Sequence, residues 1–182
     1  MAEGKYDHLF LSGPKPWYQT ASGPVIAHLE NDYLQGAHQY HIHWVPVEPV
    51  GAVPGLTSWD QMGHGPHTHK SPEVMIHIGT DPDNPYDLGA EIEFGMGTEV
   101  EKHVFNTSTL VYLPAGFMHG PWIVKKVTRP FVVVTVCQEL EHTEKAYPEI
   151  VPEEVRKKLM FVNQNYDSPE RIVTTPEGIG EW

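Results

Sequence analysis

The chain alternates apolar and polar residues in short runs, which is the pattern of β-strands that bury one face. Tyr40, Ile42 and Trp44 fall on one face of such a strand, and His41 and His43 fall on the other. The alternation predicts that many short strands make up most of the chain. Further strands are expected at residues 25–29, 67–79, 89–95, 109–113 and 119–127.

Residues 131–137 are apolar on both faces and predict a central strand that is covered on both sides. The 16 glycines and 17 prolines are dispersed between the runs and indicate turns. Residues 49–66 hold many of them and predict a long loop that is functional or packed as a lid. Pro152, followed by acidic and then basic residues, predicts one short helix. The fold class is therefore all-β, a sandwich or barrel.

Composition excludes several classes of partner. The formal net charge of −12 argues against a nucleic-acid partner and against anionic lipid. No apolar stretch is long enough to span a bilayer, and the N-terminal residues lack the apolar segment of a signal peptide, so a cytoplasmic protein is expected. The single cysteine, Cys137, lies in an apolar run and is expected to be a buried, inert thiol.

Candidate chemistry is concentrated in residues 63–79. His67 and His69 are two positions apart on a strand and therefore point to the same side, and Glu73 can return to that side after a small turn. His119 follows a Pro-x-Gly turn that could aim its ring inward from a neighbouring strand. Three imidazoles and one carboxylate suit one divalent transition metal, Mn, Fe, Co, Ni or Zn, better than Ca or Mg.

These residues resemble the two sequence motifs of the cupin superfamily. Residues 67–73 match the His-x-His-x3–4-Glu part of the first motif, and residues 114–119 match the Pro-x-Gly-x2-His part of the second. The resemblance implies a double-stranded β-helix, or jelly-roll barrel. It also implies that the metal ligands are His67, His69, Glu73 and His119.

The sequence departs from the cupin pattern at four positions. Gln61 and Ser108 stand where glycines are expected, Ile123 replaces an asparagine, and the closing Gly79 comes one residue early. None of the four is a ligand position, so the departures concern local turn geometry and leave the predicted metal site intact.

At 182 residues the chain suits one domain with a sizeable core. We expect an N-terminal arm at residues 1–37, the cupin barrel at 38–140, and a C-terminal helix and tail at 141–182. Cupin-like barrels often pair through their sheets, and the arm could exchange between subunits, so a homodimer is expected.

Other histidines have simpler explanations beside functional ones. His64 is a turn histidine or a residue of the pocket rim, and His77 is a core histidine or an acid/base of the pocket. The pair His41 and His43 imitates the metal motif, but no matching carboxylate or fourth ligand accompanies it, so a second metal site is not expected.

Several side chains are candidates to contact a substrate, although most of them could equally belong to the core. His77 and Tyr112 are candidate proton shuttles. The candidate pocket residues are Tyr40, Trp44, Met75, Phe117, Met118 and Trp122.

Two functions remain open. The first is a metal-dependent enzyme on a small organic acid, keto or hydroxy substrate, of dioxygenase, decarboxylase, isomerase or lyase type. The second is a non-catalytic protein that binds a metal and a small ligand. The motif does not choose between them, because a fold does not determine a function.

Overall fold

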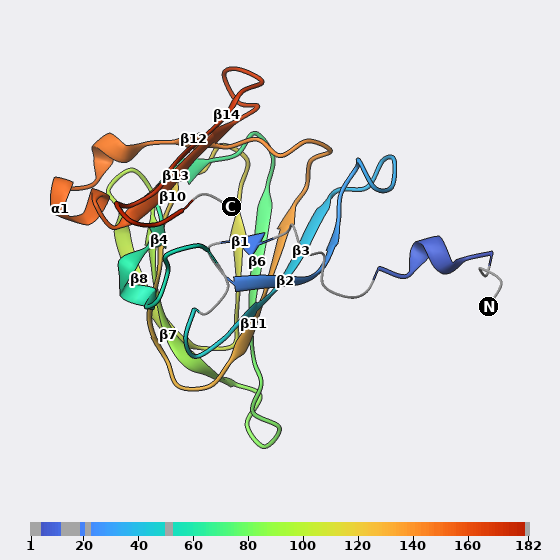
Figure 1. The fold of residues 1–182 in the computed structure, drawn as a ribbon, viewed down its shortest axis with the longest axis horizontal. Helices are drawn as coiled ribbons and strands as arrows, with labels where there is room; N and C mark the ends of the chain where they lie inside the picture. Colours follow the sequence, from blue (N-terminus) through green and yellow to red (C-terminus); the bar gives the residue numbers. More distant parts are fainter. Residues whose placement is uncertain (1–4, 12–18, 21–22, 50–52, 181–182) are drawn as a thin grey trace.

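The computed structural model describes residues 5–11, 19–20, 23–49 and 53–180. In this part of the chain, two mainly antiparallel sheets face each other; β3, β6 and β11 lie on the right in Figure 1, and β4, β7 and β8 lie on the left. The first sheet has the order β1 (Gln19–Thr20), β2 (Gly23–Leu29), β3 (Gln39–Val45), β11 (Phe131–Cys137), β6 (Glu73–Gly79) and β9 (Thr109–Leu113).

The second sheet has eight strands. Its order is β12 (Lys145–Ala146), β5 (His67–Thr68), β10 (His119–Val127), β4 (Gly63–His64), β13 (Leu159–Gln164) and β14 (Arg171–Thr174), and β7 (Asp87–Met96) also pairs with β10 and with β8 (Glu101–Thr107). From β6 to β11 the chain crosses repeatedly between the sheets, which is the double-stranded β-helix arrangement. The all-β prediction is confirmed. The predicted barrel needs correction, because the sheets form an open sandwich that does not close.

The core lies between the two sheets. Inward-facing side chains of β7, β9 and β11 interdigitate there, because alternate residues of a strand point to opposite faces. Among the fully buried side chains are Leu88, Ile92, Phe94, Leu113, Phe131 and Val133.

The register of β3 and β11 decides which face of the first sheet points inward. His43 is paired with Val133, and Val133 is paired with His77 on β6, so these three side chains share the inner face. Tyr40 and Trp44, by contrast, are 41% and 37% exposed on the outer face. β11 is central, as predicted, but outward-facing valines of this strand are only half-buried, so the described residues do not fully cover it.

The long loop before β4 packs on the core. It contains a 3-10 turn, η2 (Trp59–Gln61), and it buries Val53, Leu56, Trp59 and Met62. The indole N–H of Trp59 donates to the carbonyl oxygens of Pro46 and Val47 at 3.2 and 3.0 Å. The loop is therefore a packed cover over one end of the sandwich.

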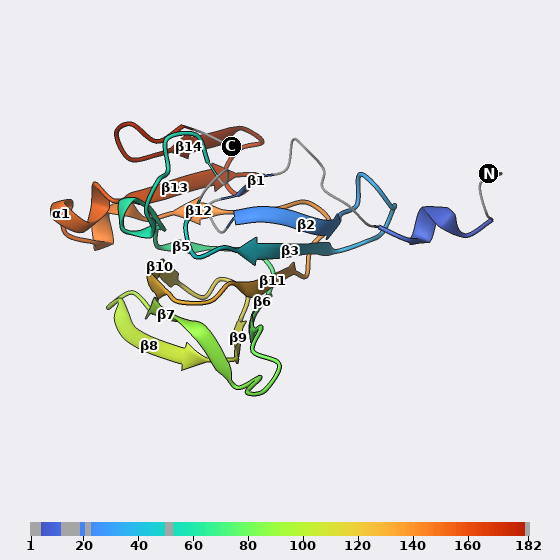
Figure 2. The ribbon, with the colours of Figure 1, turned by 60° about the horizontal axis from the view of Figure 1, so that its bottom comes forward.

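The C-terminal segment differs from the sequence prediction. The helix α1 covers only Glu153–Arg156, and β13 follows it and pairs in parallel with β4. β14 then pairs with β13 (Figure 2). Two short 3-10 turns complete the described elements, η1 (Asp7–Leu9) and η3 (Pro148–Ile150). Within the described residues, no helix is long and apolar enough to cross a membrane.

Candidate metal centre

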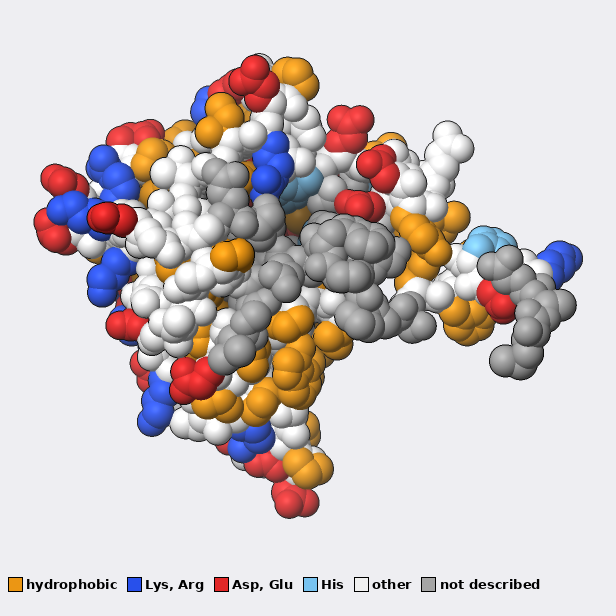
Figure 3. Space-filling model, in the orientation of Figure 1, with side chains coloured by type: hydrophobic (Ala, Val, Ile, Leu, Met, Phe, Trp, Pro, Cys, Tyr) orange, Lys and Arg blue, Asp and Glu red, His pale blue; other side chains and the backbone are white. Residues whose placement is uncertain are grey.

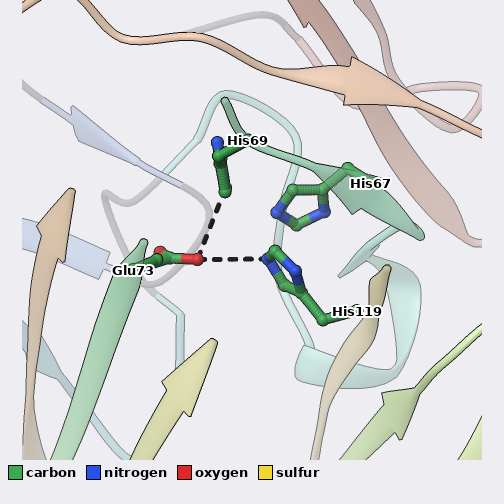
Figure 4. A group of neighbouring side chains, drawn as sticks. All are labelled: His67, His69, Glu73 and His119. Carbon is green, nitrogen blue, oxygen red and sulfur yellow. Dashed lines mark ion pairs between the residues drawn. The ribbon is translucent and has the colours of Figure 1, made fainter. Parts of the chain in front are cut away.

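Four side chains converge inside the sandwich, and they are the four that the sequence predicts as ligands. His67, His69, Glu73 and His119 are each 5% exposed or less, and one potential ligand atom of each lies within 4.8 Å of the others. The Glu73 Oε2 atom is 3.3 Å from His69 Nε2 and 3.1 Å from His119 Nε2. Figure 4 shows the three rings and the carboxylate directed at a common point.

Both sheets supply ligands to this point. Glu73 begins β6 in the first sheet, and His67 on β5 is paired with His119, the first residue of β10, in the second. The predicted turn delivers His119: the N–H of Phe117 donates to Pro114 at 3.0 Å, and the N–H of Gly116 donates to the carbonyl of His69 at 2.8 Å. The turn is therefore tied directly to the first motif.

Gly120 allows the two ligand strands to approach closely. Its φ is +95°, and a Cβ atom at this position would lie 2.6 Å from the carbonyl oxygen of Gly65. A side chain would therefore meet both backbone strain and a direct clash. Glycine at this position keeps β10, and His119 with it, against the segment that leads to His67.

Each ligand histidine is oriented by a backbone carbonyl. The Nδ1 atoms of His67 and His119 lie 2.7 and 3.0 Å from the carbonyl oxygens of Gly65 and Phe117. The Nδ1 atom of His69 bonds to the carbonyl oxygen of Thr143. A carbonyl only accepts, so each Nδ1 carries the proton, and each Nε2 then offers its lone pair to the centre when the ring is neutral.

The atoms that face the centre have few partners. His69 Nε2, His119 Nε2 and Glu73 Oε2 are buried, and among the described residues they meet only one another, in the ion pairs of 3.3 and 3.1 Å. Such unsatisfied buried groups are costly and need an explanation. A divalent transition metal provides one, because three imidazole nitrogens and a carboxylate oxygen are donors that it prefers. The residues present thus fit the predicted metal.

The charges of the cluster are strongly coupled. Burial by itself lowers the pKa of His69, but the carboxylate of Glu73 outweighs it and raises that pKa to about 9. Burial likewise raises the pKa of Glu73, but His69 and His119 bring it well below its usual value. Burial and the neighbouring His119 lower the pKa of His67. The metal-free cluster is therefore held together by a carboxylate–imidazolium pair.

Of the predicted proton shuttles, neither is brought to the cluster. His77 is four residues along β6 from Glu73, a separation of roughly 13 Å for an extended strand. Its Nε2 accepts a hydrogen bond from Trp122 Nε1 at 3.1 Å, and its side chain is 1% exposed. Tyr112 is 55% exposed and is paired with Val74, which faces away from Glu73. Tyr112 therefore lies on the outer face.

The predicted pocket residues divide in the same way. Met75, Met118 and Trp122 are buried and Phe117 is partly buried; Met118 adjoins His119 in the chain. Tyr40 and Trp44 lie on the outer face of the first sheet, opposite the ligands. The buried thiol of Cys137 was predicted correctly, and its Sγ is 4.0 Å from Glu73 Oε1.

The sequence pattern does not reveal a second polar group beside the candidate ligands. Glu144 is 2% exposed and lies between His64 and His142. The ring of His64 stacks on that of His67, with centroids 4.3 Å apart. The sequence signal is weak, because Glu144 is one of several acidic residues in a polar stretch beyond both motifs.

The second His-x-His sequence, His41 and His43, does not form a cluster of potential metal ligands within the described residues. His41 and His43 point into the sandwich, and their ring centroids are 5.9 Å apart. In the described part of the chain, no group of three or more potential ligands includes either residue.

Comparison with known proteins gives only distant similarities. No protein-family model matches the sequence, and no curated protein does. Among solved structures, oxalate oxidase in complex with glycolate is 13% identical, with a TM-score of 0.47 over 81% of this chain and 68% of that chain. A protein with a double-stranded β-helix domain from Klebsiella pneumoniae is 12% identical, with a TM-score of 0.41 over 80% of this chain and 96% of that chain.

A third similar structure is the DMSP lyase DddQ from Ruegeria pomeroyi. It is 21% identical, with a TM-score of 0.35 over 61% of this chain and 44% of that chain. The double-stranded β-helix arrangement is shown by the order of the strands in the two sheets rather than by these similarities. The similarities are too distant to transfer a reaction, so the function must be argued from the metal centre itself.

Proposed function

We propose that this cupin-type chain is a metal-dependent enzyme that acts on a small organic acid, keto or hydroxy substrate. The observation that supports the proposal is a buried cluster of potential ligand atoms: His69 Nε2, His119 Nε2 and Glu73 Oε2 face one another without a further hydrogen-bond partner and converge with His67. Four protein ligands would leave one or two positions of an octahedral ion for water, dioxygen or a bidentate substrate. Dioxygenase, decarboxylase, isomerase and lyase chemistry all fit such a site.

A bound divalent metal would supply Lewis acidity, or activation of dioxygen, at this centre. The chain's own residues would hold and select the substrate. Met118 and Phe117 adjoin His119 and, with Met75 and Trp122, are the proposed apolar wall. A wall of this kind favours a small ligand whose polar groups face the metal.

The proposal is tested by turnover of the loaded protein. Protein purified without oxygen would be analysed for Mn, Fe, Co, Ni and Zn, loaded with each metal, and screened against carboxylates, keto acids and hydroxy acids with and without dioxygen. We expect metal-dependent turnover that is absent from the metal-free protein. A centre whose metal-bound water does not exchange, with no turnover of any compound, would instead support the non-catalytic binding function.

We further propose a cytoplasmic homodimer that pairs through the outer face of the first sheet. The register places only apolar side chains on this face of the four strands β3, β11, β6 and β9. They are Tyr40, Ile42, Trp44, Val74, Ile76, Ile78, Leu110, Tyr112, Val132, Val134 and Val136. An exposed apolar patch of this extent marks an interaction surface.

A second copy is the occupant that the chain itself favours. The segment around η1 stands away from the body on the right of Figure 1, and its Tyr6, Leu9 and Phe10 are 58%, 54% and 77% exposed. Hydrophobic side chains also gather at the lower right of Figure 3. Each copy would thus offer both an apolar arm and an uncharged face, and a chain of net charge −12 can approach its own copy best through an uncharged surface.

The dimer is tested by Ile76→Lys, which places a charge at the centre of the outer face. We expect a light-scattering mass of twice 20.5 kDa for the wild type and 20.5 kDa for the variant. Val104→Lys, at a position 58% exposed on β8 in the other sheet, is the matched control and should remain dimeric. A wild-type mass of 20.5 kDa would contradict the proposal.

A further inference from the structure

Glu144 is a buried carboxylate that stands beside, and outside, the four-residue cluster of His67, His69, Glu73 and His119. Its Oε1 accepts from His64 Nε2 at 2.8 Å, and its Oε2 accepts from His142 Nε2 at 3.1 Å. The side chain of Glu144 is 3% exposed, whereas that of His64 is 26% exposed. An ionised carboxylate in such a place is costly unless it is paired and hydrogen-bonded, so its position needs a reason beyond packing.

The carboxylate lies directly beside the ligand histidines. A potential ligand atom of Glu144 is within 4.8 Å of one on His67 and of one on His69. Ala146, two residues on, is paired with His67, so Glu144 directly precedes β12, the strand that flanks β5. The residue before it, Thr143, accepts the Nδ1 proton of His69. The segment therefore both orients a ligand and brings a negative charge to it.

Glu144 itself does not complete the ligand shell. Its two oxygens are directed at different histidines, whereas a single Oε2 of Glu73 faces both His69 and His119. One divalent cation and three neutral imidazoles leave two positive charges, and Glu73 cancels one of them. A second buried carboxylate at this distance can compensate the other.

Another carboxylate of this segment has a different task. Glu139 accepts from the N–H and the hydroxyl of Thr143 at 2.8 and 2.6 Å, and it is 3.7 Å from His142. It therefore fixes the Thr143 backbone and faces His142. Glu144 is the carboxylate that contacts His64, the histidine stacked on the ligand His67.

We propose that Glu144 is a positioning residue of the metal centre, which compensates the charge of the bound divalent ion without ligating it and holds His64 against His67. This inference rests on the proposed metal centre. It has two consequences of opposite sign. Loss of the negative charge weakens binding of the cation, and it strengthens binding of an anion to the metal once the metal is bound.

The test is Glu144→Gln in the full-length chain, with cobalt(II) as the metal and azide as the anion. Competition with a chelator gives the cobalt affinity, and the visible spectrum of the cobalt-loaded protein follows azide binding. We expect the cobalt affinity to fall by about 10- to 100-fold, as for partners of metal ligands. We expect azide to bind the saturated cobalt protein several-fold more tightly, roughly three- to tenfold.

Two variants serve as controls. Glu144→Asp keeps the charge and should keep both affinities within about threefold of the wild type. Glu93→Gln removes a mostly buried carboxylate that pairs with Lys102 at 2.9 Å and Lys125 at 3.6 Å, away from the centre, and should change neither affinity. If Glu144→Gln does not fold, Glu144→Gln with His64→Gln replaces the carboxylate–imidazole contact by an amide pair and is measured instead.

The outcomes separate this inference from the proposed function. An unchanged cobalt affinity, or a joint loss of cobalt and azide affinity, would overturn the charge role of Glu144. Failure of the wild type to bind any cobalt would overturn the metal centre itself. Weaker cobalt binding together with tighter azide binding supports the inference, because a purely structural defect has no reason to improve anion binding.

Discussion

The chain contains two His-x-His sequences, and within the described residues only one of them joins a cluster that could hold a metal. His67 and His69 lie in the centre, with ring centroids 4.9 Å apart, and His41 and His43 lie on β3 with centroids 5.9 Å apart. Both pairs point into the same sandwich. The spacing of the histidines, which is all that the two sequences share, is therefore insufficient to create the site.

The surroundings of the two pairs make the difference. Glu73 raises the pKa of His69 to about 9 against the effect of burial. At His41 and His43, burial dominates and lowers the pKa values to about 3 and about 4, so these rings stay neutral. A converging carboxylate and a set of backbone carbonyls that fix the ring tautomers turn a buried histidine pair into a ligand pair.

The largest expected effect comes from Glu73→Gln, which makes the first pair resemble the second. We expect the affinity for a divalent metal to fall by more than about 100-fold, since a charged ligand is lost in addition to the orientation it gives. In the metal-free variant, the pKa of His69 should fall well below 9, as measured by NMR titration. His41→Gln is the matched control and should leave metal affinity unchanged; equal losses in both variants would contradict the distinction.

A second prediction concerns the pH dependence of stability of the metal-free protein. The folded pKa of His69 is raised above its ordinary value of 6.5, so its stabilisation is complete below pH 6.5 and is lost as the pH rises through about 9. The folded pKa of His43 is lowered to about 4, so stability is lost as the pH falls from 6.5 towards 4. His69 thus limits the stability of the folded protein at high pH, and His43 limits it at low pH.

Urea unfolding between pH 4.5 and 9.5 would measure how the free energy of unfolding changes on the acid side and on the alkaline side. In Glu73→Gln, the free energy of unfolding should fall less as the pH rises towards 9.5. In His43→Gln, its slope against pH on the acid side should be smaller by about 1.4 kcal/mol per pH unit, the value for one proton. An acid limb that is unchanged in His43→Gln would show that this histidine is protonated in the folded protein.

A smaller effect is expected from His77→Gln, which tests a third buried histidine on the same strand as Glu73. His77 accepts a hydrogen bond from Trp122 and lies far from the candidate ligands along β6, which indicates a role in the core. We expect metal affinity within about threefold of the wild type and a loss of roughly 1–2 kcal/mol in the free energy of unfolding at pH 7.5. A loss of turnover at unchanged stability would restore His77 as an acid/base.

The sequence was sufficient for the all-β fold class and for the four side chains that converge in the cluster. The alternation of residues predicted short strands, and the Pro-x-Gly turn before His119 predicted a fourth ligand that the structure brings to the other three. Alternation could not determine which face of β3 points inward. Tyr40 and Trp44 are apolar and yet outward-facing, because period-two patterning groups residues by face without saying what covers each face.

Long-range neighbours could not be predicted either. Glu144 reaches the centre only because its segment pairs with β5, about 75 residues earlier in the chain. β13 was not predicted as a strand, because its Leu159, Met160 and Phe161 are buried on both faces and show no alternation. Its pairing with β4 is a tertiary interaction that local pattern does not encode.

The most direct test of the account is metal stoichiometry, measured on the wild type, His67→Ala and His41→Ala after loading with cobalt(II) and removal of excess metal. We expect one tightly bound cobalt per chain in the wild type and in His41→Ala, and almost none in His67→Ala. Stoichiometric cobalt in His67→Ala, or its loss in His41→Ala, would show that the ion lies elsewhere and that the ligand assignment is wrong.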